Sequence, residues 1–430
     1  MLNLARKGKI RNAISATTLF FAEELFVFTS VETKIIMTKA TRREWSLATK
    51  LVHSGEAPDE STGAIAPVLV RSKTFAQKEF GKASEFQYSR GNNPTRAKLE
   101  EKLAELEGGG RAVVYASGLA AENAFFFTLS PGDHVLCCQE VYGGTFRLLD
   151  KVLARFGITF DFVDFTSEKS IRAGIKENTK YLYVETPTNP SLHIINLALV
   201  SKVSKATGIP FVVDATFSPP CALQAFRFGA ETVIHSLSKY IAGHNDIIGG
   251  AVITKNNHLY DDLVFLNRTM GAILSPDECY RVLQEVKTLE LRWKRVSETA
   301  LTVATFLEKN RAIEKVLYPG LPSHPGHAIA KKQTQGGYGA IVSFVIKQKN
   351  TKKLKRFVDT LRTNSPIVYG ESLASPETIL AYPPLMSHKS LPDDVRESLG
   401  ITDGFFRLSV GFEDAEDIIH GLREGLAAIS

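Results

Sequence analysis

The stretch Thr232-Val-Ile-His-Ser-Leu-Ser-Lys-Tyr-Ile-Ala-Gly-His-Asn-Asp246 decides the fold class. Its first four residues form a short, β-branched run that is typical of a buried strand. Lys239 follows closely, with hydroxyl groups ahead of it at Ser236 and Ser238. Most lysines at strand ends point to solvent, and a buried lysine usually has a function. A desolvated lysine near other cations becomes a nucleophile toward an aldehyde, so Lys239 is a candidate reactive amine, although on this stretch alone an ordinary exposed lysine is the favoured interpretation.

Short apolar runs of the same kind recur along the chain, and helical patterns separate them. They lie at 112–115, 134–137, 160–163, 181–184, 211–214, 232–235 and 251–254. This alternation predicts an α/β fold whose mainly parallel sheet has helices on both faces. Ahead of it, Asn93-Pro94 predicts the start of a helix that ends near Gly108.

Beyond about residue 290 the pattern changes, which predicts a smaller C-terminal α+β domain. Its expected strands are 341–346, 367–369 and 406–410, and its expected helices are 353–361 and 415–427. We therefore divide the chain into an extension (1–36), an N-terminal arm (37–95), a large domain (96–290) and a C-terminal domain (291–430).

The composition excludes several classes of protein. The chain has 430 residues, of which 44% are hydrophobic and 23% charged, as in soluble globular proteins. Its net charge of +6 is scattered, with no basic run among aromatics, so we expect no nucleic-acid partner. Cys137, Cys138, Cys221 and Cys279 form no CxxC pair and have no histidine at metal spacing, which predicts no metal site and a reducing, cytoplasmic location.

Residues 1–36 differ from the rest, with a basic start followed by the apolar stretch 16–28. Glu23 and Glu24 interrupt that stretch, which disfavours both a signal-peptide core and a membrane span. A mitochondrial presequence is one alternative, but we favour a disordered extension or a true start at Met37. No other segment could span a bilayer, so we expect no membrane association.

Two further segments carry candidate ligand groups. Asp214 ends an apolar strand, where open α/β sheets place ligand groups, and it could keep a pyridine nitrogen protonated, although a simple helix cap is the alternative. Ser117-Gly118-Leu119 leads from a strand into a helix whose free N–H groups would suit a phosphate, or it is an ordinary turn. The absence of GxGxxG and GxxxxGK[ST] argues against a dinucleotide or nucleoside triphosphate there.

Nine ordered motifs together are far more specific than any one of these signals. They are Tyr88-Ser-Arg90-Gly-Asn-Asn-Pro-Thr, Ser117-Gly-Leu, Val141-Tyr-Gly-Gly-Thr, Glu185-Thr-Pro-Thr-Asn-Pro, Asp214-Ala-Thr-Phe, Ser236-Leu-Ser-Lys-Tyr, Gly243-His-Asn-Asp, Glu371-Ser-Leu and Arg407-Leu-Ser-Val-Gly. With them, the sequence from about residue 51 to its end resembles the cystathionine γ-synthase/γ-lyase family. These are pyridoxal-phosphate enzymes of Cys/Met metabolism with the aspartate-aminotransferase-like, type I fold.

The resemblance implies how pyridoxal 5′-phosphate would be held. Lys239 would form its Schiff base, Asp214 would pair with the ring nitrogen, and Tyr142 would stack on the ring. The remaining cofactor-binding residues would surround the phosphate and the ring oxygen: Gly118, Leu119, Ser236, Ser238, Thr216 and Asn189. Tyr88 and Arg90 would reach the phosphate from a neighbouring subunit, so the resemblance implies a homotetramer built from two such dimers.

The resemblance also implies how an amino-acid substrate would bind. Arg407 would grip its α-carboxylate, assisted by Asn189, and Ser372 would orient Lys239. The chain departs from the usual pattern at Ala215, Leu237 and the pair Ala374-Ser375, where the family has Asn, Ala and Gly-Gly. These departures affect specificity more than cofactor chemistry.

Several reactions share this machinery. Lys239, once free, would move protons at Cα and Cβ, and Tyr142 would relay protons to it and to the leaving group. Glu371 resembles the acidic residue of γ-lyases and γ-synthases, although a surface glutamate at a pocket rim is the alternative, and Gly144 argues against a methionine γ-lyase. Of these alternative activities we favour cystathionine γ-elimination. Cystathionine γ-synthesis is the second choice and cystathionine β-elimination the third. A non-catalytic relative would be expected to lack Lys239, Asp214 or Arg407.

Overall fold

A computed structural model describes residues 44–386, 389, 396, 397 and 399–429. The expectations for residues 1–36 lie outside the described residues, as do residues 37–43 of the expected arm. From Thr49 onward the chain forms one compact unit. Of the described helices, none is long and apolar enough to cross a membrane.

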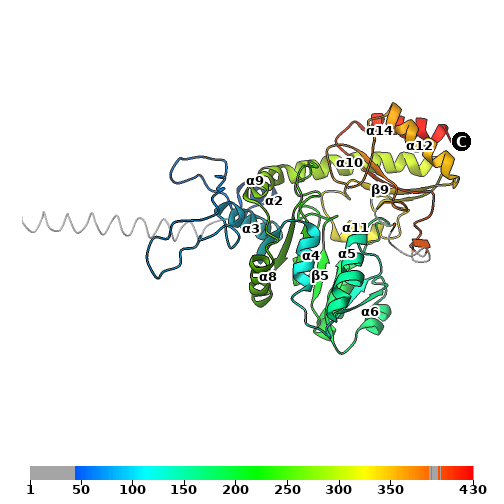
Figure 1. The fold of residues 1–430 in the computed structure, drawn as a ribbon. Coiled ribbons are helices and arrows are strands. Elements are labelled where there is room, and N and C mark those ends of the chain that lie inside the picture. Colours follow the sequence, from blue (N-terminus) through cyan, green and yellow to red (C-terminus); the bar gives the residue numbers. More distant parts are fainter. Residues whose placement is uncertain (1–43, 387–388, 390–395, 398, 430) are drawn as a thin grey trace, which may run out of the picture. The chain divides into compact units, whose positions relative to one another are not determined.

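A seven-stranded sheet forms the first layer (Figure 1). Its order is β1-β7-β6-β5-β4-β2-β3, and all neighbours are parallel except β7, which is antiparallel to β1 and β6. The strands are β1 (Arg111–Tyr115), β2 (His134–Cys138), β3 (Thr159–Val163), β4 (Thr179–Glu185), β5 (Phe211–Asp214), β6 (Thr232–Ser236) and β7 (Gly250–Thr254). The predicted runs and the mainly parallel sheet are confirmed.

In the described part of the chain, eight α-helices precede, connect or follow these strands. They are α2 (Leu47–His53), α3 (Pro94–Leu106), α4 (Gly118–Phe126), α5 (Gly143–Arg147), α6 (Glu168–Gly174), α7 (Leu197–Thr207), α8 (Asn257–Met270) and α9 (Pro276–Glu285). The predicted start of α3 is confirmed, because the Asn93 side chain accepts the N–H groups of Thr95 and Arg96 and Pro94 lies in the first turn.

The carboxyl ends of the parallel strands meet at one edge of this sheet. Glu185 ends β4, Asp214 ends β5 and Ser236 ends β6. Because adjacent parallel strands run in register, these three residues come together although about 50 residues separate the first from the last. Open α/β sheets bind ligands at this edge.

A five-stranded sheet, ordered β10-β11-β12-β9-β8, forms the C-terminal α+β part. Its strands are β8 (Ile313–Leu317), β9 (Ile341–Ile346), β10 (Val368–Tyr369), β11 (Ile379–Ala381) and β12 (Phe405–Ser409), and its helices are α10 (Leu289–Lys309), α11 (His327–Gln333), α12 (Thr351–Asn364) and α14 (Ala415–Ala427). The sequence predicted three of these strands. It missed β8, which contains two exposed charged residues, and β11, which has only three residues.

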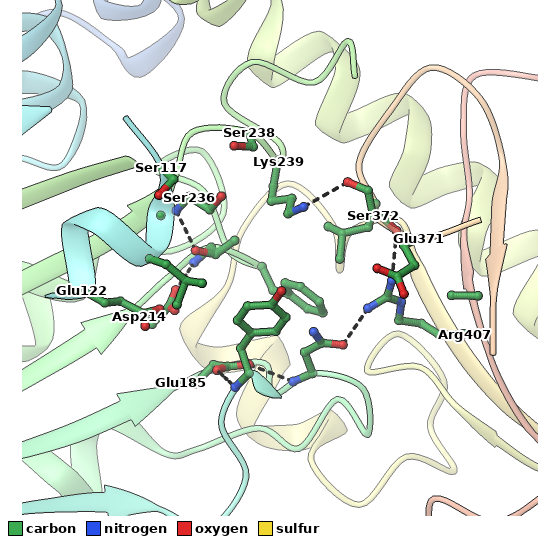
Figure 2. A pocket seen from close by; sticks show the side chains of 18 of the residues that line it. Ser117, Glu122, Glu185, Asp214, Ser236, Ser238, Lys239, Glu371, Ser372 and Arg407 are labelled. Atoms are coloured by element: carbon green, nitrogen blue, oxygen red, sulfur yellow. Dashed lines mark hydrogen bonds between the residues drawn. The ribbon is translucent and has the colours of Figure 1, made fainter. Parts of the chain in front are cut away.

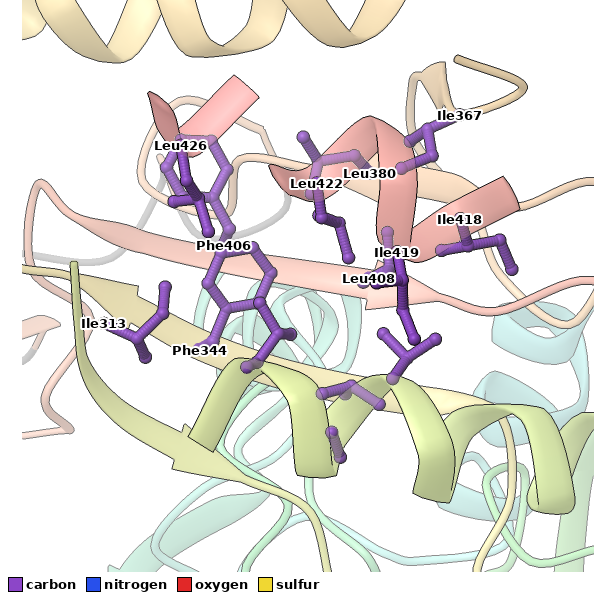
Figure 3. Close-up of a cluster of buried hydrophobic side chains, with 14 of the residues drawn as sticks. Ile313, Phe344, Ile367, Leu380, Phe406, Leu408, Ile418, Ile419, Leu422 and Leu426 are labelled. Carbon is purple, nitrogen blue, oxygen red and sulfur yellow. The ribbon is translucent and has the colours of Figure 1, made fainter. Parts of the chain in front are cut away.

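An apolar core holds this second sheet against its helices (Figure 3). Ile418, Leu422 and Leu426 recur on one face of α14 and pack with Phe406 and Leu408 of β12. Successive side chains of a strand point to opposite faces, so burying Phe406 and Leu408 in this core turns Arg407 the other way. The core therefore directs one arginine out of the C-terminal sheet toward the first sheet.

Candidate active site

A cavity of about 220 Å³ lies at the carboxyl edge of the first sheet and is closed by the C-terminal part (Figure 2). It brings together twelve of the fourteen predicted site residues: Gly118, Leu119, Tyr142, Asn189, Asp214, Thr216, Ser236, Ser238, Lys239, Glu371, Ser372 and Arg407. These residues come from segments almost 300 positions apart, and both sheets contribute to the cavity.

Lys239 follows β6 in a turn, and its side chain enters the cavity. Its Nζ donates to the Oγ of Ser372 at 3.0 Å. Burial, and then the charge of Arg407, lower the pKa of Lys239 to about 8, against the opposing effect of Glu371. Near neutral pH a larger fraction of this amine is therefore unprotonated than in an ordinary lysine, and only the unprotonated amine can act as a nucleophile or base.

Arg407 lies at the end of the cavity that the C-terminal part forms. One terminal nitrogen donates to Asn189 Oδ1 at 2.8 Å and the other donates to the carbonyl of Ser372 at 2.9 Å. The backbone N–H of Asn189 is held in turn by Glu185 at 2.9 Å. Burial lowers the pKa of Arg407 to about 10, so the group stays charged. Its buried Nε has no hydrogen-bond partner among the residues that the structure describes. This fixed cation is suited to a carboxylate ligand.

The opposite end of the cavity is acidic. Asp214 Oδ1 accepts the backbone N–H of Thr216 at 2.9 Å, and burial raises the pKa of Asp214. Burial also raises the pKa of Glu122 and of Glu185 well above their usual range, with the charge of Asp214 as the second cause. Buried carboxylates ionise readily only when a cation compensates them, so this end favours a ligand with a positively charged ring nitrogen.

The third side of the cavity is the N-terminus of α4. Ser117 caps this helix by accepting the N–H of Ala120 at 3.0 Å. Gly118 allows close packing, since a Cβ added there would lie 2.8 Å from the Cβ of Ser236. Free N–H groups at a helix N-terminus bind phosphate, and hydroxyls from Ser236 and Ser238 line the same cavity. Ser238 already accepts the N–H of Gly249 at 3.0 Å.

The segment that positions Lys239 and Arg407 has unusual backbone geometry. Ser372 and Ala374 have φ angles of 80° and 63°, in the left-handed region that non-glycine residues rarely adopt. Ala374 is held there because its N–H donates to Ser409 Oγ at 2.8 Å. The position where the family has glycine thus keeps a glycine-like conformation with an alanine in place.

Two of the predicted residues do not line the cavity of this chain. Tyr88 is half exposed, and Arg90 donates to the backbone carbonyl of Arg268 at 2.6 Å. The sequence assigned both residues to a neighbouring subunit's site, and that assignment stays a prediction.

Comparison with known proteins places the chain among relatives of similar length. Residues 48–427 match the model of the family described as Cys/Met metabolism PLP-dependent enzyme. The chain belongs to this family. A cystathionine beta-lyase of Lactococcus lactis subsp. cremoris is 42% identical over 89% of this chain and 99% of its own length.

Two solved structures of the same family show the same fold. A cystathionine gamma-lyase of Lactobacillus plantarum, complexed with L-serine, has a TM-score of 0.85 and 38% identity over 90% of this chain and 99% of its own. A cystathionine gamma synthase of Xanthomonas oryzae pv. oryzae has a TM-score of 0.86 and 36% identity over the same shares. The chain is therefore a pyridoxal-phosphate enzyme of fold type I with an amino-acid substrate.

The cavity fits this cofactor. The acidic end offers Asp214 to a pyridine nitrogen, and the N-terminus of α4 offers N–H groups to a phosphate. Lys239 extends from the segment beside them with the lowered pKa that reaction with an aldehyde requires. The ring nitrogen, the phosphate and the aldehyde of the cofactor thus each have a chemically complementary group in the cavity.

Several residues that line the cavity were not predicted from the sequence: Glu122, Glu185, Phe217, Leu373 and Met386. Glu185, Phe217 and Leu373 lie within motifs already noted. Glu122 could have been found from its spacing, because it lies one helical turn after Gly118 and so shares that residue's side of the helix. No comparable signal marks Met386.

Proposed function

We propose that this enzyme cleaves cystathionine by γ-elimination to cysteine, 2-oxobutanoate and ammonia. The observation that carries this proposal is Glu371, which lines the cavity at the substrate end and acts electrostatically on both Lys239 and Arg407. Cystathionine has a second ammonium group far from its reacting carbon. A carboxylate at the rim gives that ammonium an oppositely charged partner.

The chain's own residues would divide the work among them. Arg407 would hold the α-carboxylate, and Lys239 would take the proton from Cα and then move one at Cβ. Ser372 would keep the Lys239 amine aimed at these atoms through its 3.0 Å hydrogen bond. Tyr142 would relay protons to the amine and to the leaving sulfur. The bound cofactor supplies an electron sink for the electron pair that remains when each C–H bond breaks.

β-Elimination is the second candidate, and the 42% identity to a cystathionine beta-lyase favours it. γ-Replacement with an activated homoserine is the third, supported by the likeness to a cystathionine gamma synthase. The three reactions give different products from the same machinery.

A product assay separates these reactions. Pure enzyme is incubated with cystathionine alone and, separately, with cysteine plus an O-acylhomoserine. We expect 2-oxobutanoate and cysteine from the first mixture. Pyruvate and homocysteine would instead identify a β-lyase, and cystathionine formed only in the second mixture would identify a γ-synthase.

Lys239 provides the direct test that the cavity is catalytic. Lys239→Ala should lose both the visible absorbance of the lysine-bound cofactor and the activity, since the amine is removed. The control is Lys255→Ala, because Lys255 is exposed and lies outside the cavity. Lys102 is buried, so its replacement would disturb the fold. A Lys239→Ala protein that kept the band and the activity would contradict the assignment.

We also propose that the enzyme is cytoplasmic and a homotetramer, with Tyr88 and Arg90 completing a neighbouring subunit's site. Its four cysteines are buried and free, as suits a reducing compartment. We also propose the boundaries 37–95, 96–290 and 291–430, which rest on the change in the sequence pattern. Both sheets belong to one compact unit.

A further inference from the structure

Glu122 is a buried carboxylic acid in the cavity to which the proposed reaction gives no role. Only 4% of it is exposed, and it lines the cavity from α4. Figure 2 shows its side chain beside that of Asp214, at the end of the cavity away from Arg407. The residue expected to meet the cofactor's ring nitrogen therefore has a second acid next to it.

The contacts of Glu122 leave one oxygen unsatisfied by any donor. Oε1 accepts from the hydroxyl of Thr145 at 3.0 Å, whereas Oε2 is buried and has no hydrogen-bond donor within the described part of the chain. The carboxyl of Asp214 interacts directly with that of Glu122. Two neighbouring carboxylates cannot both ionise at little cost, but one proton between them turns repulsion into a hydrogen bond.

The groups around this pair do not offer Glu122 a cation among the described residues. Cys137 of β2 and Tyr183 of β4 interact electrostatically with Glu122, and Glu185 of β4 interacts with Asp214. His235 of β6 acts on Asp214 instead, and its Nε2 is bound to Glu107 at 2.5 Å. Burial and the charge of Asp214 together raise the pKa of Glu122 well above its usual range.

We propose that Glu122 is a positioning residue of the cofactor site, whose protonated carboxyl donates a hydrogen bond to Asp214 and holds it as a single anion toward the ring nitrogen. A neutral donor fixes the direction of the Asp214 carboxylate without adding a second negative charge. This inference rests on the proposed role of Asp214, and the variants below separate the two.

Stability of the full-length, cofactor-free protein tests the protonation state directly. The folded-state pKa of Glu122 is raised, so its contribution to stability is present below the pKa of an unfolded glutamate and is lost as the pH rises through the folded value. Glu122→Gln keeps a donor but cannot ionise. We expect its melting temperature, relative to wild type, to increase steadily as the pH is raised from about 5 to about 9.

Glu140→Gln is the matched control. Glu140 is equally buried, but its hydrogen bonds and the charge of His193 lower its pKa despite the opposing effect of burial. Its carboxylate is needed in ionised form, so Glu140→Gln should lower the melting temperature at neutral pH. A Glu122→Gln protein that behaved like Glu140→Gln, or whose difference from wild type did not vary with pH, would overturn the proposal.

Cofactor binding, followed by the visible band of the reconstituted enzyme, supplies the second readout. Glu122→Gln should bind within about twofold of wild type, whereas Glu122→Met, of similar size but without a donor, should bind roughly tenfold to a hundredfold more weakly. Equal binding by Gln and Met variants would show a packing role only and refute the inference. Asp214→Asn separates a failure of this inference from a failure of the proposed role of Asp214. If Asp214→Asn also binds the cofactor normally, the assignment of Asp214 is wrong, and the role of Glu122 falls with it.

Discussion

At the scale of single residues, the charge environment of Lys239 decides when the enzyme can take up its cofactor. A pKa of about 8 leaves about one amine in ten unprotonated at pH 7, against roughly one in three thousand for an ordinary lysine. Because only the free amine attacks the aldehyde, the uptake rate should rise with pH and level off above about 8.

Glu371 gives this pH dependence a test. Its negative charge raises the pKa of Lys239, so Glu371→Gln should move the midpoint of cofactor uptake to lower pH. The measurement is the rate at which the visible band appears after cofactor is added to cofactor-free protein. Glu377→Gln, at an exposed acid of the same loop outside the cavity lining, is the control and should leave the midpoint in place. An unchanged midpoint in Glu371→Gln would contradict the proposed electrostatic role.

Ser372 should affect catalysis and substrate binding differently. Its hydroxyl accepts from Lys239, whereas its backbone carbonyl accepts from Arg407. Ser372→Ala removes only the first bond, so kcat should fall roughly tenfold, as expected for about 1–1.5 kcal/mol, while KM changes little. Ser375→Ala, whose hydroxyl bonds only within its own loop, should leave both constants unchanged. A rise in KM without a fall in kcat would argue against this role.

At the scale of secondary-structure elements, the packing of α4 against β6 sets the position of the phosphate site. A Cβ at residue 118 would lie 2.8 Å from the Cβ and 3.2 Å from the Cα of Ser236, so one of the two elements must shift. Gly118→Ala should therefore weaken cofactor binding and lower the melting temperature, both measurable on one sample series. Gly370→Ala, where the nearest atom would be 3.9 Å away, should be tolerated. Normal cofactor affinity in Gly118→Ala would contradict the close packing.

The sequence predicted elements better than contacts between them. All seven strands of the first sheet were found because each contains a short apolar or β-branched run, even the half-buried edge strand β3, whereas β8 was hidden by its exposed charges. The positions of Lys239 and Asp214 followed from strand ends and motifs. The pairing of Glu122 with Asp214 could not be predicted, because it depends on how α4 packs over β6 and β7, and Asp214 lies about 90 residues further along the chain.

At the scale of the whole molecule, the proposed assembly depends on Tyr88 and Arg90, which the sequence assigned to a neighbouring subunit's site. Both belong to a family motif, yet neither lines the cavity of its own chain. Their segment instead runs over the surface, with Tyr88 half exposed. This placement agrees with a site shared between subunits, in which each chain supplies its Tyr88 and Arg90 to a partner.

Hybrid assemblies test that sharing. Lys239→Ala and Arg90→Ala chains, each expected to be inactive alone, are produced together with different affinity tags and purified over both tags. In a mixed dimer, the Lys239→Ala chain supplies an intact Arg90 to the site that keeps Lys239, so roughly a quarter to a half of wild-type activity should return. Lys239→Ala mixed with Asp214→Ala is the control and should stay inactive, because both lesions lie in their own chain's cavity. If mixing Lys239→Ala with Arg90→Ala restores nothing, Arg90 acts within its own subunit and the shared site is wrong.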